Sequence, residues 1–156
     1  MQAGDRLAAI LLHPLTTGAR FQDWPLHITL VPWFRPANGT AELTVLLEAA
    51  LGGIRPFEIT VGKDAFFGYH GRKLVSLIQM DDSLALIERT IRRIIKDRGG
   101  WIADEKTRRK RTFYPHVTVQ GMQRVHQEDH IFIDRFTMIE QEGSGKNVVG
   151  EVMLRG

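Results

Sequence analysis

One pattern of histidine, aliphatic, threonine and aliphatic residues occurs twice in the chain, at 27–30 and at 116–119. Side chains alternate between the two faces of a β-strand, so the histidine and threonine of each copy share one face. Two such strands lying together would bring His27, Thr29, His116 and Thr118 around one space. This set suits phosphate chemistry without a metal, because one imidazole accepts a proton, the other donates one, and the hydroxyls bind phosphate oxygens.

The doubling makes the pattern informative. With six histidines in the chain, one accidental copy has odds of about one in twenty, and two copies of less than about one in a hundred. The alternative is that both copies are ordinary strands whose histidines are partly buried and hydrogen-bonded. This alternative is less favoured for two copies of the pattern than it would be for a single copy. Four other histidines lack such a partner and are expected at the surface, namely His13, His70, His126 and His130.

The doubled motif resembles the 2H phosphoesterase family, which is named for its two histidines and includes bacterial 2′-5′ RNA ligase-like proteins and RNA cyclic phosphodiesterases. The likeness extends to the segments between the motifs: Phe66-Phe67-Gly68, an apolar run at 74–78 and a helix beginning near Ser83. It covers most of the chain. It implies an α+β fold of two pseudo-twofold-related lobes, each with an antiparallel sheet and flanking helices, with the active-site groove between them.

The resemblance also implies an activity and residue roles. His27 and His116 are expected to act as general acid and base, and Thr29 and Thr118 to donate hydrogen bonds to the phosphate. The expected reaction is hydrolysis of 2′,3′-cyclic phosphates on RNA ends or small nucleotides. The reverse reaction, attack of a 2′-hydroxyl on the cyclic phosphate, would be ligation in the same site. No cofactor and no metal is expected.

The elements that must position the motifs follow from periodicity. Alternating apolar residues predict strands and a 3.6-residue period predicts helices. Pro32 and Pro36 are expected to end the second strand, Thr40 to cap the first helix, and Asp81 or Ser83 to cap the second. The predicted order is β-β-α-β-β-α-β-β-β, with strands at 6–12, 26–31, 57–63, 73–80, 114–120, 131–142 and 148–154, helices at 40–51 and 83–98, and a hairpin turn at 143–147.

Aromatic and cationic side chains near the motifs are candidates for binding the nucleotide. Aromatic rings stack on bases, and arginines contact phosphates. The alternative for the aromatic residues is that they pack in the core. The predicted substrate-binding residues are Phe34, Phe67, Tyr69, Arg72, Arg111 and Tyr114.

Positive charge is concentrated before the second motif. The formal net charge is +3, and residues 106–111 are basic at five of six positions. Such a run attracts backbone phosphates when a phosphate site lies nearby. Several RNA-processing relatives carry an arginine five residues after the second histidine, whereas this chain has Gly121 there and its nearest arginine is Arg124. The missing charge is expected to come from elsewhere, such as the basic run.

Length and composition set broad limits. A chain of 156 residues is expected to form one domain, 1–156, and its lack of cysteine excludes disulfides and thiolate metal sites. No apolar run approaches the roughly 20 residues of a membrane span, and the apolar stretch at 7–12 is too short for a secretory signal. The chain is therefore expected in the cytoplasm, with RNA ends or a small nucleotide phosphodiester as its partner and no obligate protein partner.

Two other function classes remain open. The first is a nucleotide- or RNA-binding module of the same fold with little turnover, although a binder has no need of an acid–base pair. The second is a metallohydrolase that uses the histidines as ligands. Asp23 and Glu42 near the first motif show no ligand spacing, which disfavours this second class.

Overall fold

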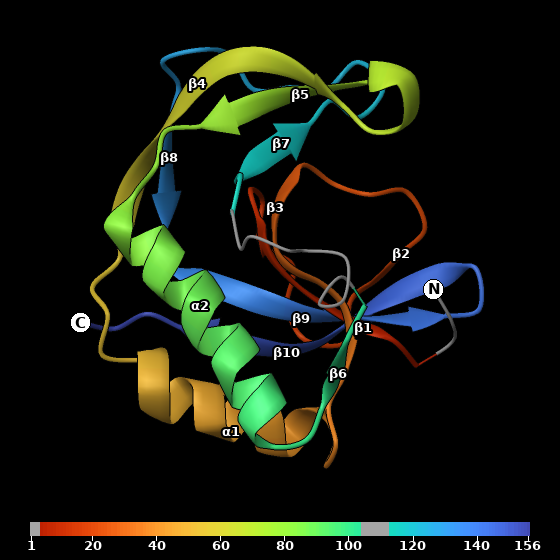
Figure 1. Ribbon diagram of the computed structural model, residues 1–156, viewed down its shortest axis with the longest axis vertical. Helices are drawn as coiled ribbons and strands as arrows, with labels where there is room; N and C mark the ends of the chain where they lie inside the picture. Colours follow the sequence, from red (N-terminus) through yellow and green to blue (C-terminus); the bar gives the residue numbers. More distant parts are fainter. Residues whose placement is uncertain (1–3, 104–112) are drawn as a thin grey trace.

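The computed structural model describes residues 4–103 and 113–156 (Figure 1). The predicted α+β class is confirmed. The elements in chain order are β1 (Arg6–Leu11), β2 (Arg20–Phe21), β3 (His27–Arg35), α1 (Thr40–Leu51), β4 (Phe57–Phe67), the 3₁₀ turn η1 (Tyr69–Gly71), β5 (Lys73–Ile78), α2 (Asp82–Asp97), β6 (Trp101–Ile102), β7 (His116–Thr118), β8 (His130–Ile133), β9 (Arg135–Glu142) and β10 (Gly145–Met153).

The two motif strands join the two halves of one sheet. Within the described residues the strand order is β2-β10-β9-β1-β3-β7-β5-β4-β8, and β6 pairs with β3 at the side of this path. All of these pairings are antiparallel. Strand β3 ends the half that carries the first motif, and β7 begins the half that carries the second. Figure 1 shows the two halves above and below this junction.

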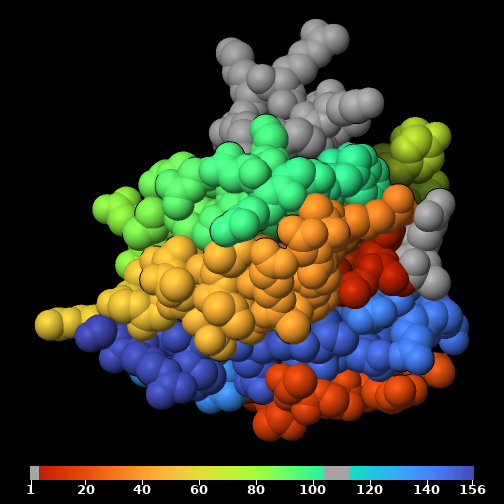
Figure 2. Space-filling model, turned by 90° about the horizontal axis from the view of Figure 1, so that it is seen from below, coloured from red at the N-terminus to blue at the C-terminus, as the bar shows by residue number. Residues whose placement is uncertain are grey.

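Both helices pack on one face of the sheet, where the larger hydrophobic core lies. Helix α1 contacts α2 and β10, and α2 contacts β3. Figure 2 shows α2 (green) and α1 (orange to yellow) side by side. The core includes Ile28 and Val117, which are 0% and 1% exposed, together with apolar residues of both helices. Ile28, Leu30 and Val117 therefore anchor the motif strands from the helical side, as the alternation predicts.

A second, smaller core lies on the other face of the first half. It contains Leu7, Ala9, Leu11, Ile139 and Val148, with partly buried aromatic residues packed against it. Across β1 and β3, Leu11 pairs with His27 and Ala9 pairs with Thr29. Directly opposed residues of neighbouring strands point to the same face. The polar side chains of the first motif therefore share their face with this smaller core and lie opposite the helices.

The bounds of two predicted strands are wrong, and in both cases the pairing with neighbouring strands explains the difference. Pro32 does not end β3, which continues to Arg35, because a bulge in the pairing with β1 between Val31 and Phe34 accommodates a residue without an amide hydrogen. The predicted strand at 131–142 is two strands. Residues before Asp134 pair with β4, and those after it pair with β1 and β10.

Smaller differences occur at element ends. Strand β4 continues to Phe67 through a stretch predicted as loop, because its pairing with β5 extends that far, and the predicted loop around residue 20 contains β2. Helix α1 has its predicted bounds, but Gly39 rather than Thr40 is the N-cap. The capping of α2 by Asp81 is confirmed, since its carboxylate accepts a hydrogen bond from the Leu84 amide. No helix in the described part of the chain is long and apolar enough to cross a membrane.

Candidate active site

The two motifs meet across β3 and β7, where Ile28 pairs with Val117. In an antiparallel register, one step in opposite directions along the two strands brings His27 opposite Thr118 and Thr29 opposite His116. Opposed side chains of this kind have Cβ atoms about 5 Å apart. The Ile28–Val117 pair therefore lies on a local twofold axis, and each imidazole lies beside the hydroxyl of the other motif. All four polar side chains are half-buried.

Both imidazoles are oriented by the same hydrogen bond. The Nδ1 of His27 lies 2.8 Å from the Pro25 carbonyl oxygen, and the Nδ1 of His116 lies 2.7 Å from the Tyr114 carbonyl oxygen. A carbonyl can only accept, so each Nδ1 carries the proton and donates it. Each Nε2 is then the nitrogen that accepts or releases a proton during chemistry. The carbonyl lies two residues before the histidine in both motifs, which extends the twofold relation to the backbone.

The electrostatic environment favours the neutral form of His27. Burial is the largest cause that lowers the pKa of His27 below its ordinary value, because a charged imidazole is poorly solvated there. The Pro25 hydrogen bond acts in the opposite direction, and the positive charges of His116 and Lys73 lower the pKa further. A neutral imidazole with a free Nε2 is what a general base requires near neutral pH.

Each imidazole also contacts one aromatic ring. Trp24 stacks on His27, with ring centroids 4.5 Å apart and an interplanar angle of 30°. Phe67 contacts His116 edge to face, at 4.8 Å and 79°. Trp24 is in turn held by Phe21 and Trp33, at centroid distances of 5.3 and 6.4 Å. These contacts fix the plane of each imidazole and exclude water from one side of it.

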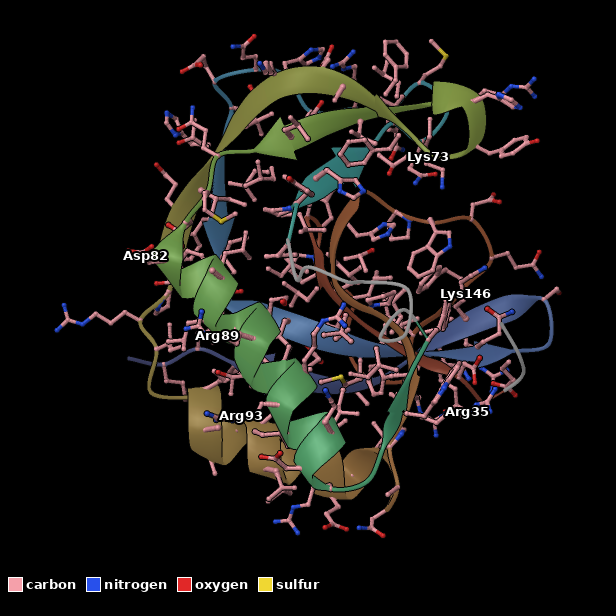
Figure 3. All side chains as sticks on the ribbon, in the orientation of Figure 1. Arg35, Lys73, Asp82, Arg89, Arg93 and Lys146 are labelled. Carbon is pink, nitrogen blue, oxygen red and sulfur yellow. The ribbon has the colours of Figure 1, made fainter. Side chains whose placement is uncertain are left out.

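Lys73 supplies positive charge on the same face as the motifs. Phe67 pairs with Lys73 across β4 and β5, and Val75 pairs with Thr118 across β5 and β7. Lys73 and Val75 are two positions apart, so the Lys73 side chain shares its face with Thr118. This side chain is exposed, and no carboxylate of residues 4–103 or 113–156 forms an ion pair with it. In Figure 3 it lies at the start of β5.

The turn before Lys73 depends on glycine. Gly68 and Gly71 have backbone φ angles of 83° and 60°, which residues other than glycine rarely adopt. The Gly71 amide donates to the Gly68 carbonyl at 3.0 Å, and this closes the turn between β4 and β5. Phe67 and Lys73 are brought opposite each other by this turn.

The predicted substrate-binding residues fall into different environments. The structure brings Phe67 to the site, as its contact with His116 shows. Tyr114 and Tyr69 are 63% and 83% exposed, and the Tyr69 ring lies 4.0 Å from that of His70. Arg72 is exposed at the turn before β5.

Phe34 is a correction. Its side chain is 0% exposed and belongs to the larger core, so it has no surface on which a base could stack. It packs in the same core as Ile28, which puts it on the aliphatic face of β3. The alternative interpretation of this aromatic, packing in the core, is the one that the structure supports.

The extra charge was expected from the basic run, and Arg124 is the arginine nearest to Gly121. The run at 106–111, including Arg111, lies outside the described residues. Arg124 donates to Asp64 at 2.6 Å and to the Val125 carbonyl at 3.0 Å. It also contacts the hydroxyl of Ser76, which pairs with Val117 and so points to the core face of the sheet. The Arg124 side chain therefore binds groups on the face of the sheet opposite the imidazoles and supplies no charge to the site.

Trp24 and Lys73 were not among the residues predicted from the sequence to form the site. Lys73 stands at the start of a predicted strand, but its place beside Thr118 depends on the pairing of β5 with β7, which the sequence does not show. No local signal identifies Trp24, whose position depends on the chain between β1 and β3 folding back over the smaller core.

In the described part of the chain, no three His, Asp or Glu side chains are grouped as metal ligands.

Comparison with known proteins identifies the family and the fold. A family model described as the 2′-5′ RNA ligase superfamily matches residues 5–138. The chain is similar to E. coli LigT complexed with 3′-AMP, at 17% identity and a TM-score of 0.59, over 99% of this chain and 100% of LigT. It is similar to the protein TT0787 of Thermus thermophilus at 17% identity and a TM-score of 0.61, over 97% and 98% of the two chains.

A third solved structure, described as a phosphoesterase, has 16% identity and a TM-score of 0.57, over 99% of this chain and 100% of that one. At such identities the likeness establishes a shared fold. No curated protein matches the chain. The family model spans both histidine motifs and most of the residues between and around them. The chain thus belongs to the 2′-5′ RNA ligase superfamily, the 2H phosphoesterases.

Proposed function

We propose that this chain is a metal-independent phosphodiesterase that hydrolyses 2′,3′-cyclic phosphates on RNA ends or small nucleotides. The observation that carries the proposal is the paired orientation of the imidazoles, in which both Nδ1 atoms donate to backbone carbonyls and both Nε2 atoms remain for proton transfer. Family membership supports a phosphodiester-acting enzyme. LigT, which shares the fold, is known in complex with 3′-AMP and with phosphate, and this supports a nucleotide phosphate as the ligand.

The proposed reaction assigns one role to each histidine. Neutral His27 removes a proton from a water molecule, whose oxygen forms a bond to phosphorus. The bond from phosphorus to the 2′- or 3′-oxygen breaks, and protonated His116 donates its Nε2 proton to that leaving oxygen. The product is a phosphomonoester beside a free hydroxyl, and proton exchange with solvent restores both imidazoles. The lowered pKa of His27 supports its assignment as the base.

The remaining side chains would stabilise the charge that develops on phosphorus. The hydroxyls of Thr29 and Thr118 donate to the two non-bridging oxygens, one from each side of the local twofold axis. Lys73, on the same face as Thr118, supplies the positive charge that the glycine at position 121 cannot. Fixed donors aimed at developing charge are among the strongest contributions to catalysis.

The test is turnover of 2′,3′-cyclic AMP and of a short RNA with a 2′,3′-cyclic end, both in EDTA. The variants His27→Ala and His116→Ala should each lose at least about 10²-fold in kcat/KM, as expected for removal of a general acid or base. Retention of turnover in EDTA is part of the expected result. The position of the product phosphate identifies the leaving oxygen.

The second candidate is a binding module of the same fold. The half-burial of both imidazoles and the aromatic cover on His27 are equally suited to holding a phosphate without turnover. Wild-type protein that has no turnover but still binds nucleotide would favour this candidate.

The proposed phosphodiesterase function includes a location and a partner. The proposed location is the cytoplasm, which is consistent with a chain that has no cysteine. The proposed partner is an RNA end or a small nucleotide.

A further inference from the structure

An open groove lies between β2 and the hairpin of β9 and β10. Its volume is about 490 Å³. It is lined by Arg20, Phe21, Gln22, Glu142, Ser144, Gly145, Lys146 and Asn147. Strand β2 pairs with β10 through Phe21 and Lys146, so the two sides of the groove are joined at its base. The mechanism proposed above uses none of these residues.

One ring connects the groove to the candidate active site. The Nζ of Lys146 lies 5.4 Å from the centroid of the Trp24 ring, and Phe21 contacts the same indole edge to face at 5.3 Å. Trp24 stacks on His27 at 4.5 Å. Two residues that line the groove therefore contact the indole that covers the proposed catalytic base. A ligand in the groove would therefore lie against residues that contact this indole.

Among the described residues, one of the two cations in the groove forms no ion pair with a carboxylate. Arg20 forms an ion pair with Glu142 at 3.8 Å, and Asn147 donates a hydrogen bond to the same carboxylate. Lys146 donates to the Gln22 carbonyl at 3.4 Å and forms no ion pair with a carboxylate in the described residues. Figure 3 shows Lys146 and Lys73 on the same side of the molecule, one on each half of the sheet.

We propose that this groove binds the RNA strand next to the terminal cyclic phosphate, with Lys146 holding a backbone phosphate. The inference rests on the proposed function and narrows its substrate to an RNA end in preference to a mononucleotide. An ammonium, an aromatic ring and side-chain amides are the groups that bind single-stranded RNA through phosphate contact, stacking and hydrogen bonds. Lys146, Phe21 and Gln22 supply all three.

The experiment compares kcat/KM for a tetranucleotide ending in a 2′,3′-cyclic phosphate with kcat/KM for the mononucleotide cyclic phosphate of the same base. Lys146→Ala should lower the ratio of RNA to mononucleotide activity about tenfold, the usual value of one charge-assisted contact. Lys146→Arg should keep most of the ratio, because it keeps the charge. Arg89→Ala, which removes an exposed cation on α2, should leave the ratio unchanged.

A structural role for Lys146 predicts a different result. If Lys146 serves only to pack against Trp24, its removal will lower both activities equally and leave the ratio unchanged. That outcome, or no change in either activity, would overturn the proposal. Circular dichroism of Lys146→Ala and Lys146→Arg establishes that the variants are folded.

Binding separates this proposal from the proposed function. Fluorescence anisotropy of a labelled RNA that carries the product phosphate should show a slope of log K against log salt that is smaller by about 0.7 in Lys146→Ala, as one lost phosphate contact predicts for a single strand. If wild type turns over neither substrate, the proposed function is wrong, and this slope still decides the role of the groove. An identical slope in the two proteins would overturn the groove as a phosphate site.

Discussion

The indole of Trp24 lies on the imidazole of His27, with centroids 4.5 Å apart and planes inclined by 30°. This stacking holds the ring whose Nδ1 donates to Pro25 and excludes water from one of its faces. Burial is also the leading cause of the lowered pKa of His27. The same contact therefore positions the proposed base and keeps it neutral.

Removal of this cover should change the pH dependence of activity. In Trp24→Leu, better solvation of the imidazolium raises the pKa of His27 toward its ordinary value of about 6.5. The acidic limb of the pH profile of kcat/KM, where the base becomes protonated, should therefore move to higher pH. Trp24→Phe keeps an aromatic cover and should shift the limb less. A limb that stays in place in Trp24→Leu would contradict the role of Trp24 as a cover.

The same pKa shift predicts how stability depends on pH. The pKa of His27 is lower in the folded than in the unfolded chain, so the unfolded chain binds more protons between the two values. The stability linked to His27 is present above about pH 6.5 and is lost as the pH falls through the folded pKa. Urea unfolding across this range should show a smaller acid loss in His27→Asn than in wild type. Parallel curves for the two proteins would exclude this linkage.

The threonines should act through their hydroxyls. Thr29→Val and Thr118→Val retain shape and remove a donor, so each should lower kcat by about 10²-fold, as loss of one oxyanion donor does. Thr→Ser variants keep the hydroxyl and should recover most of the rate. Equal losses in the valine and serine variants would indicate a packing role in place of hydrogen bonding.

Lys73 should contribute to phosphate binding through its charge. Lys73→Ala should weaken competitive inhibition by inorganic phosphate about tenfold, the magnitude of one charge-assisted contact, while Lys73→Arg should retain it. Arg93→Ala on α2 is the matched control, since it also removes one exposed cation. Loss of Lys73 should also raise the pKa of His27, because its positive charge opposes protonation there. If both alanine variants weaken phosphate inhibition equally, only net charge matters.

Helix α2 provides a test of stability independent of activity. The Asp81 carboxylate accepts a hydrogen bond from the Leu84 amide at 3.0 Å. Asp81→Ala should lower the free energy of unfolding by about 1 kcal/mol, whereas Asp81→Ser should cost less because serine also caps helices. Chemical denaturation measures both. An alanine variant as stable as wild type would show that the cap contributes nothing in this context.

Local chemistry in the sequence determined both helices, the approximate positions of most strands and the polar face of each motif. Alternation puts His27 with Thr29 and His116 with Thr118 whatever the partner strand, because it depends only on the pleat of the backbone. Helix α1 has its predicted bounds, and Asp81 is the cap because its side chain reaches an amide three residues away. The likeness of the doubled motif to the 2H phosphoesterases likewise depended on residues a few positions apart.

Tertiary structure decided what lies beside those motifs. The pairing of Ile28 with Val117, the bulge that admits Pro32 and the change of partner at Asp134 are contacts between segments far apart in the chain. Trp24 is close to His27 in the chain, but its packing on the smaller core involves distant segments as well. Strand register is set by the burial of whole faces rather than by neighbouring residues. The sequence by itself therefore determined which groups carry the chemistry, and only the fold decided their mutual register, their cover and their nearby charge.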